Sequence, residues 1–147
     1  MSHKYLLLLL SLAVVLGGCK KDESKPESEP VLAGRWPLHS ITYLEYDSLG
    51  RQTSQTPEFV FPPERGYYLA VTDSTMQQYY ANGTPYTTLR HYTRTGNVLI
   101  YRGASTSWIN TITLLTATEL RILEKYSRLQ NGRRFYIGED HRYLRPE

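Results

Sequence analysis

Apolar and polar residues alternate in short runs along most of this chain, from Val31 onward, and clusters of turn-forming residues separate the runs. Side chains of a β-strand point alternately to its two faces, so a period of two predicts half-buried strands. The runs are rich in β-branched and aromatic residues, which favour strands. The predicted strands cover residues 35–46, 59–61, 67–72, 75–80, 87–93, 98–102, 108–115, 120–126, 135–137 and 142–145.

The predicted strands follow one another at a spacing of about ten residues, which is typical of an antiparallel β-sandwich or an up-and-down β-barrel. Turn signals such as Asn82-Gly83 join successive strands through short loops. Short loops favour pairing between sequence neighbours, and a closed sheet leaves no open edge. We therefore expect an all-β, antiparallel up-and-down barrel of about eight strands, whereas helical and parallel folds fit the pattern poorly.

The beginning of the chain has a different pattern: a short basic start, the apolar residues 5–16, and then Leu16-Gly17-Gly18-Cys19. The twelve apolar residues would span only about 18 Å as a helix, which is too short for a bilayer core. Leu16-Gly17-Gly18-Cys19 resembles the lipobox of bacterial lipoproteins. The resemblance implies a signal peptide over residues 1–18 and a lipid on Cys19. An ordinary signal peptide followed by a chance cysteine is the alternative.

Residues 20–30, KKDESKPESEP, contain no apolar side chain. Such a segment cannot bury surface to offset the entropy of ordering, so it predicts a disordered tether behind the lipidated Cys19. The tether would hold the domain formed by residues 31–147 on the order of 20 Å from the membrane. Cys19 is the only cysteine, so disulfides are excluded and the domain must be stable through its own core.

The first residues of the tether bear on the location of the protein. Lys20 stands where some lipoproteins carry an aspartate that retains them in the inner membrane, so we expect a lipid anchor in the outer membrane of the cell envelope. Lys21-Asp22-Glu23 resembles the tag that sends some lipoproteins to the cell surface. A solvated linker explains the same three residues, so the periplasmic and surface faces both stay open.

The opening of the first predicted strand, Leu32-Ala33-Gly34-Arg35-Trp36-Pro37-Leu38, resembles the L-x-G-x-W-x-L signature of bacterial lipocalin-like lipoproteins. The resemblance implies a barrel in which Gly34 allows a close turn and Trp36 closes one end. It also implies that an arginine near the end of the chain, Arg142 or Arg145, covers the Trp36 ring. Pro37 departs from a regular strand because it lacks an N–H, and should lie at an edge or a bulge.

Thirteen tyrosines are the unusual feature of the composition, and two pairs of them are adjacent in sequence. Because neighbours in a strand point to opposite faces, each pair places one ring inside the barrel. An inward set, Tyr68, Tyr80, Tyr92 and Tyr101, would line a cup for a small hydrophobic or amphipathic ligand. Ordinary strand packing is the alternative, because a small barrel can be filled by its own side chains.

Signals for catalysis and for metal binding are weak. The chain has four histidines, His3, His39, His91 and His141. The first lies in the signal peptide and the others occupy separate segments without ligand spacing, so we expect no metal and no cofactor. Glu139-Asp140-His141 precedes the last predicted strand and is interpreted as a solvated loop. Nucleophile elbows, phosphate-binding glycine loops and dinucleotide fingerprints are absent from the sequence, so we expect a non-catalytic protein.

The net charge is +3, and basic residues gather toward the end of the chain, at Arg121, Lys125, Arg128, Arg133 and Arg134. This cluster suits anionic lipid headgroups or envelope glycans, although the solvent face of a hairpin is the simpler explanation and the one we expect. Export excludes nucleic acid as a partner. Two hypotheses for the function remain: a lipocalin-like lipoprotein that binds a small amphipathic ligand, and a side-chain-filled barrel that binds an envelope protein or glycan.

Overall fold

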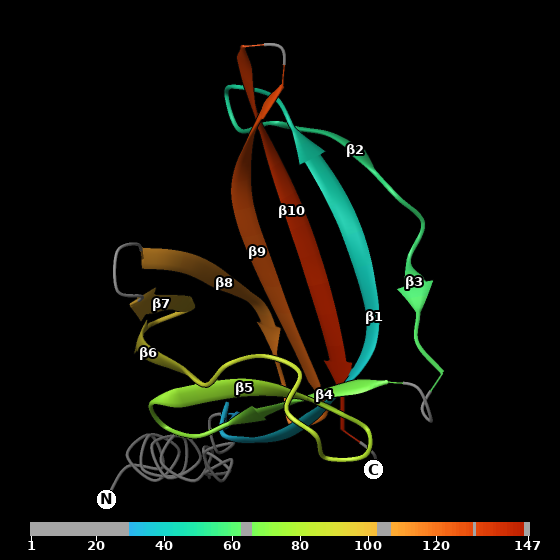
Figure 1. Cartoon of the computed structure of the whole chain (residues 1–147), viewed down its shortest axis with the longest axis vertical. Helices are drawn as coiled ribbons and strands as arrows, with labels where there is room; N and C mark the ends of the chain where they lie inside the picture. Colours follow the sequence, from blue (N-terminus) through green and yellow to red (C-terminus); the bar gives the residue numbers. More distant parts are fainter. Residues whose placement is uncertain (1–29, 63–65, 103–106, 131, 146–147) are drawn as a thin grey trace, which may run out of the picture.

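The computed structural model describes residues 30–62, 66–102, 107–130 and 132–145, and within these stretches the chain is all-β. Over the same stretches, no helix is long and apolar enough to cross a membrane. The predicted signal peptide, Cys19 and the tether up to residue 29 lie outside the described residues. The strands are β1 (Gly34–Tyr46), β2 (Gln52–Gln55), β3 (Phe59–Val60), β4 (Tyr67–Val71), β5 (Thr75–Tyr80), β6 (Arg90–Thr95), β7 (Val98–Arg102), β8 (Ser107–Leu115), β9 (Glu119–Gln130) and β10 (Arg133–Leu144) (Figure 1).

Eight of these strands form one closed antiparallel barrel. From β4 to β10 each strand pairs with the next in sequence, and β1 pairs with β4 at one end of this series and with β10 at the other. The closing ladder is long and joins residues 38–46 of β1 to residues 136–143 of β10. The prediction of an up-and-down β-barrel is therefore confirmed, and the sandwich is excluded.

β1 pairs with another barrel strand along each of its edges. Gly34 to Pro37 pair with β4, and from Leu38 onward the other edge of the strand pairs with β10. Pro37 stands where the first ladder ends, and the register of the second ladder shifts between Leu38 and Ser40. A residue without an N–H is tolerated beside such an irregularity, as the sequence predicts.

The segment from Gln52 to Val60, which we call the strap, runs beside β1 beyond the end of β4 (Figure 1). It contains β2 and β3, and both pair with β1. Glu58 fastens the strap to the barrel, because Ser40 Oγ donates a hydrogen bond to it and Arg142 Nη1 lies 3.7 Å from its carboxylate. β2 was not predicted, because its four residues are polar and exposed and carry no alternating pattern.

Trp36 closes one end of the barrel and is fully buried. Its Nε1 donates to the carbonyl of Leu32 at 2.7 Å, and the Arg145 guanidinium lies 3.6 Å from the ring centroid, within cation–π range. Arg145 Nη2 also donates to the carbonyl of Ala33 at 2.8 Å. Gly34 has a φ of +133°, and a Cβ there would lie 2.6 Å from Arg145 Nη2, so this close approach requires glycine. Of the two arginines proposed to cover Trp36, the structure places Arg145 on the ring.

The last strand differs from the prediction. Residues 135–137 and 142–145 were expected to be separate strands, but β10 runs without interruption and pairs residue by residue with β9. The interpretation of Glu139-Asp140-His141 as a solvated loop is wrong, because these residues pair with residues 122–124 in the middle of the β9–β10 ladder. The cause of the error is polarity: Glu139 and His141 occupy inward positions where the pattern requires apolar side chains, so the alternation is not visible in sequence.

Trp36→Ala is expected to lower the free energy of unfolding by about 3 kcal/mol or more, because the substitution leaves a cavity beneath Arg145. The matched control is Trp108→Ala at the other tryptophan of the chain, which is 47% exposed and is expected to cost about 1 kcal/mol or less. Urea unfolding of both variants measures the difference. Equal losses would show that Trp36 does not seal the barrel.

Candidate ligand-binding cavity

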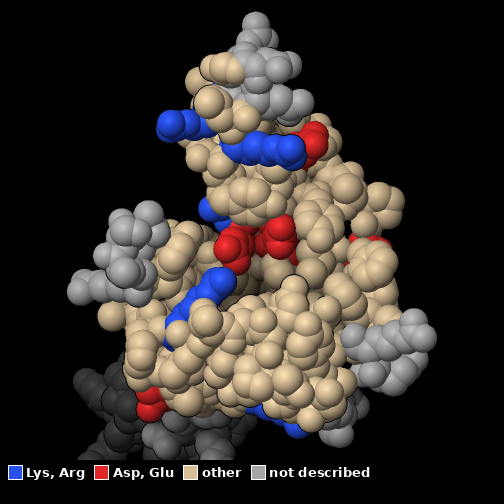
Figure 2. Space-filling model, in the orientation of Figure 1, with Lys and Arg blue, Asp and Glu red and all other residues tan. Residues whose placement is uncertain are grey.

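A cavity of about 340 Å³ lies inside the barrel and opens on the face seen in Figure 2. This volume falls within the range of small-molecule sites. Acidic side chains gather around the hollow in the middle of this face, and a basic side chain borders its lower edge (Figure 2). The lining residues are Leu38, Ile41, Tyr43, Phe61, Tyr67, Leu69, Met76, Gln77, Gln78, Tyr86, Thr87, Arg90, Tyr101, Asn110, Ile122, Glu124, Glu139, His141 and Tyr143.

One part of the cavity wall is apolar. Leu38, Leu69, Met76 and Ile122 are buried there and belong to the same core cluster as Trp36. Phe61, directly after the strap, packs against this cluster and contributes to the wall. The sealed end of the barrel therefore continues into an apolar surface that suits a hydrocarbon or aromatic group.

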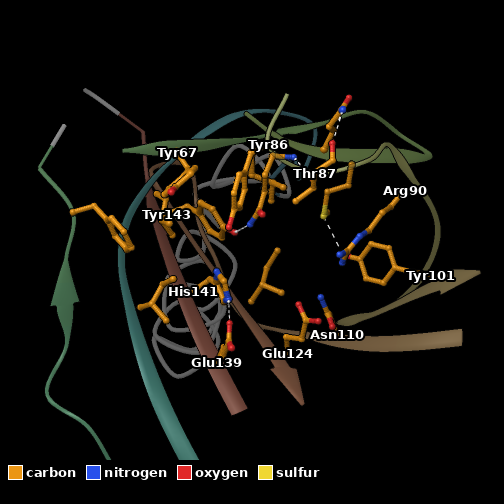
Figure 3. Close-up of a pocket in the computed structure, with 18 of the residues that line it drawn as sticks. Tyr67, Tyr86, Thr87, Arg90, Tyr101, Asn110, Glu124, Glu139, His141 and Tyr143 are labelled. Carbon is orange, nitrogen blue, oxygen red and sulfur yellow. Dashed lines mark hydrogen bonds and ion pairs between the residues drawn. The ribbon is translucent and has the colours of Figure 1, made fainter. Parts of the chain in front are cut away.

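A second part of the wall is a row of polar side chains at one level of the sheet, which we call the polar row: Tyr43, Glu139, Glu124 and Asn110. They come from β1, β10, β9 and β8, and the strand register sets each directly opposite the next. All four line the cavity. The sheet thus holds two carboxylates and an amide side by side on its inner face, where Figure 3 shows Glu124 next to Asn110.

Glu139 is held by two neighbours on the inner face. Tyr126 Oη donates to its Oε1 at 3.0 Å. His141 Nε2 lies 3.2 Å from its Oε2 (Figure 3). The hydrogen bond from His141 holds the pKa of Glu139 below its ordinary value, and partial burial opposes the shift. Glu139 is therefore an ionised carboxylate at neutral pH. Within the described residues, the Glu124 carboxylate makes no side-chain hydrogen bond or ion pair with a neighbour.

The wall opposite the polar row comes from β5, the start of β6 and the loop between them. Gln78 Nε2 lies 3.4 Å from the Tyr143 hydroxyl and so links β5 to β10 across the barrel. Gln77 Nε2 donates to the carbonyl of Thr87 at 2.8 Å, which holds the loop against β5. Arg90 supplies the one lysine or arginine side chain among the described residues of the lining.

Two buried tyrosines complete the lining. Burial raises the pKa of both Tyr101 and Tyr143 far above the ordinary value, so both hydroxyls stay neutral. Tyr101 Oη donates to Met76 Sδ at 3.0 Å, and contact with Asn110 opposes the effect of its burial. Neutral phenols of this kind contribute hydrogen bonds and apolar surface. They do not serve as bases.

The four tyrosines of the predicted cup occupy different positions. Tyr101 lines the cavity, whereas Tyr92 is buried in the core, where its hydroxyl donates to the carbonyl of Thr72 at 2.7 Å. Tyr80 is 40% exposed and packs against Tyr67 and Tyr86 beside the cavity.

Tyr68 lies on the outer face, and its placement in the cup is wrong. Its ring stacks on that of Tyr79, and the Arg35 guanidinium lies 3.7 Å from its centroid. Tyr67 and Leu69, on either side of it, point inward. Tyr67 and not Tyr68 is therefore the member of the pair that lines the cavity. Alternation predicts that one ring of an adjacent pair points inward. The register of β4 with β5 and β1 decides which ring this is.

Sequence reasoning did not propose Tyr67, Tyr86, Tyr143, Glu124, Glu139 or Arg90 as site residues. The available signal was the polar residue at an inward position: Glu124 stands two positions after Ile122 on β9 and shares its face. A carboxylate there has no structural use in a core. Only the register between β9 and β10 places Glu139 beside it.

Arg121, Lys125 and Arg142 lie on the outer surface. Arg142 Nε is 2.9 Å from Glu119 Oε1, which also accepts from Arg121 Nε at 2.9 Å. Lys125 Nζ lies 3.8 Å from the centroid of the Tyr46 ring. These contacts fit the simple interpretation of this part of the basic cluster as the outer face of a hairpin. A second hollow of about 220 Å³ lies between this network and the strap.

Comparison of the chain with protein-family profiles, with curated proteins and with solved structures finds no match. Within the part of the chain that the structure describes, no group of three or more histidine, cysteine, aspartate or glutamate side chains is arranged to hold a metal ion. The geometry of the cavity and the sequence of the leader are therefore the observations from which a function can be argued.

Glu139→Gln and Asp140→Asn are expected to change the pH dependence of stability in opposite senses. The folded-state pKa of Glu139 lies below 4.5, so its contribution to stability is present above that pH and is lost as the pH falls through the folded-state pKa. Burial raises the pKa of Asp140 above 3.8, so this residue destabilises the fold as the pH rises from that value through the folded-state pKa.

Between about pH 3 and pH 7, the free energy of unfolding should rise less in Glu139→Gln than in the unmodified protein, and more in Asp140→Asn. Urea unfolding at the two pH values measures the slopes. A change of the same sign in both variants would contradict the environments assigned to the two carboxyls.

Proposed function

We propose that this protein is a lipocalin-like lipoprotein of the cell envelope, anchored to the outer membrane through a lipid on Cys19, whose barrel binds a small amphipathic molecule without catalysis. The cavity is the observation that carries the proposal. It has the volume of a small-molecule site, and its apolar wall and polar row lie on different parts of one lining. An amphipathic ligand is divided in the same way, into an apolar part and a polar part.

The cavity favours ligand binding over the alternative of a barrel filled by its own side chains. A filled barrel requires inward residues that interdigitate, whereas the inward residues here include ionised and amide groups around an open volume. Buried polar groups without partners are costly in a purely structural core. Their presence at the cavity wall is expected where a ligand supplies the missing contacts.

The attachment of the tether is compatible with access to the cavity. The described chain begins at Pro30, and Leu32 packs in the core beside Trp36 at the sealed end of the barrel. The cavity begins further along β1, at Leu38 and Ile41. A lipid anchor joined through residues 19–30 would thus hold the barrel by its sealed end and leave the opening free.

Uptake of N-phenyl-1-naphthylamine, an uncharged aromatic probe whose fluorescence rises in apolar surroundings, tests the cavity. Residues 31–147 contain the whole buried cluster and the closing ladder, and are expected to bind the probe. Ile41→Trp places a larger ring at the cavity wall and should reduce uptake by about tenfold or more, whereas Thr113→Trp, at an exposed position of β8, should not. Uptake that is equal in all three proteins, or absent from all three, would reject the cavity as a ligand site.

Cys19→Ser is expected to abolish incorporation of labelled palmitate during growth and to release the protein from the membrane fraction. The thiol is the group that carries the lipid in a lipoprotein, and the apolar leader is too short to anchor the chain by itself. Fractionation followed by autoradiography measures both effects. Label that persists in the variant would contradict the anchor without bearing on the cavity.

A further inference from the structure

Two acceptors of the polar row, the Glu124 carboxylate and Asn110 Oδ1, have no donor among the described residues, whereas Glu139 is bonded to Tyr126 and His141. Glu124 and Glu139 are directly opposite one another across the β9–β10 ladder, and both side chains line the cavity. Like charges directly opposite in an antiparallel pair destabilise a sheet. Arg121 of β9 could balance such a charge, but it lies on the outer face of the strand, where its guanidinium is 3.8 Å from the Asp140 carboxylate. The inner face thus concentrates negative charge at one point of the wall.

Asn110 is an independent sign that a ligand belongs there. It is 5% exposed, lines the cavity, and stands directly opposite Glu124 on the side away from Glu139. Its Oδ1 is buried and has no hydrogen-bond partner among the described residues. A buried amide oxygen without a donor destabilises the fold unless something fills its place. The missing partner must be a donor.

From these two observations we infer that the polar end of the ligand is a cationic nitrogen, an ammonium or amidinium group, bound between Glu124 and Glu139 with Asn110 Oδ1 as a further acceptor. The inference rests on the proposed ligand-binding function and specifies its ligand class. A cation with several N–H donors satisfies all three acceptors at once and removes the repulsion between the carboxylates. The apolar body of the ligand then lies along Leu69, Met76 and Ile122.

A carboxylate or phosphate at the polar end of the ligand fits this wall poorly. Such a group would face two carboxylates and an amide oxygen, and none of these donates. Arg90 is the one positive side chain of the described lining, and it belongs to β6 on the wall across from the polar row. It is exposed, and its guanidinium lies 5.9 Å from the Trp108 ring centroid. No ion pair joins Arg90 to the polar row within the described residues, so its guanidinium suits a second, anionic group on the ligand.

The test compares three six-carbon probes that differ only in their polar end: hexylammonium, hexanol and hexanoate. Binding to the full chain in lipid nanodiscs is measured by isothermal titration calorimetry, with empty nanodiscs as the blank. We expect hexylammonium to bind about tenfold more tightly than hexanol, which is about 1.4 kcal/mol, and hexanoate to bind more weakly than hexanol.

Glu124→Gln keeps the shape of the side chain and removes its charge, so it should abolish the preference for hexylammonium and leave hexanol binding intact. Asp73→Asn is the matched control, because it removes the same charge from an exposed turn outside the cavity and should leave the preference unchanged. Glu124→Asp retains the charge and should retain the preference.

Three results would overturn the inference. Equal affinity for the three probes, or a preference for hexanoate, would exclude a cationic site while the binding of hexanol still supported a ligand cavity. A preference that survives in Glu124→Gln would show that another part of the protein selects the cation. Failure of all three probes to bind would reject the proposed function together with the inference.

Discussion

The ladder between β1 and β10 is the constraint on which the rest of the molecule depends. It joins the first strand to the last, so that the inner faces of eight strands enclose one interior and no strand of the barrel has a free edge along this seam. Every inward side chain then has neighbours from both sides. The barrel is held by contacts between residues about one hundred positions apart, such as Leu38 and Tyr143.

The two parts of the interior have different physical characters. At the sealed end, Trp36 is enclosed between the core and Arg145, and its polar atom is satisfied by the carbonyl of Leu32. Further along β1 the interior holds two carboxylates and an unpartnered amide around an open volume. A protein that departs from the rules of core packing at one place, and follows them elsewhere, does so where a function requires it. The contrast within one barrel is the main argument that the polar row is a site.

Alternation predicted most strands with their approximate bounds, because a buried inner face and a wet outer face impose a period of two on the residues themselves. It failed on β10, where Glu139 and His141 point inward, and on β2, which has no apolar residue. It also chose Tyr68 in place of Tyr67. In each case the residues of a single strand could not show which side chains point inward, because pairing with the neighbouring strands decides this.

Local chemistry was sufficient for the turn signals and the Gly34-Arg35-Trp36 opening, since each acts through residues adjacent in the chain. The lining of the cavity, in contrast, depends on residues that are distant in the chain. Asn110, Glu124 and Glu139 are separated by turns and come together only because the register of three strands sets them on one line, and Arg145 reaches Trp36 only after the barrel closes. Non-local pairing is a property of the folded sheet. Sequence therefore determined that this chain forms a barrel, and tertiary structure decided which side chains line its cavity.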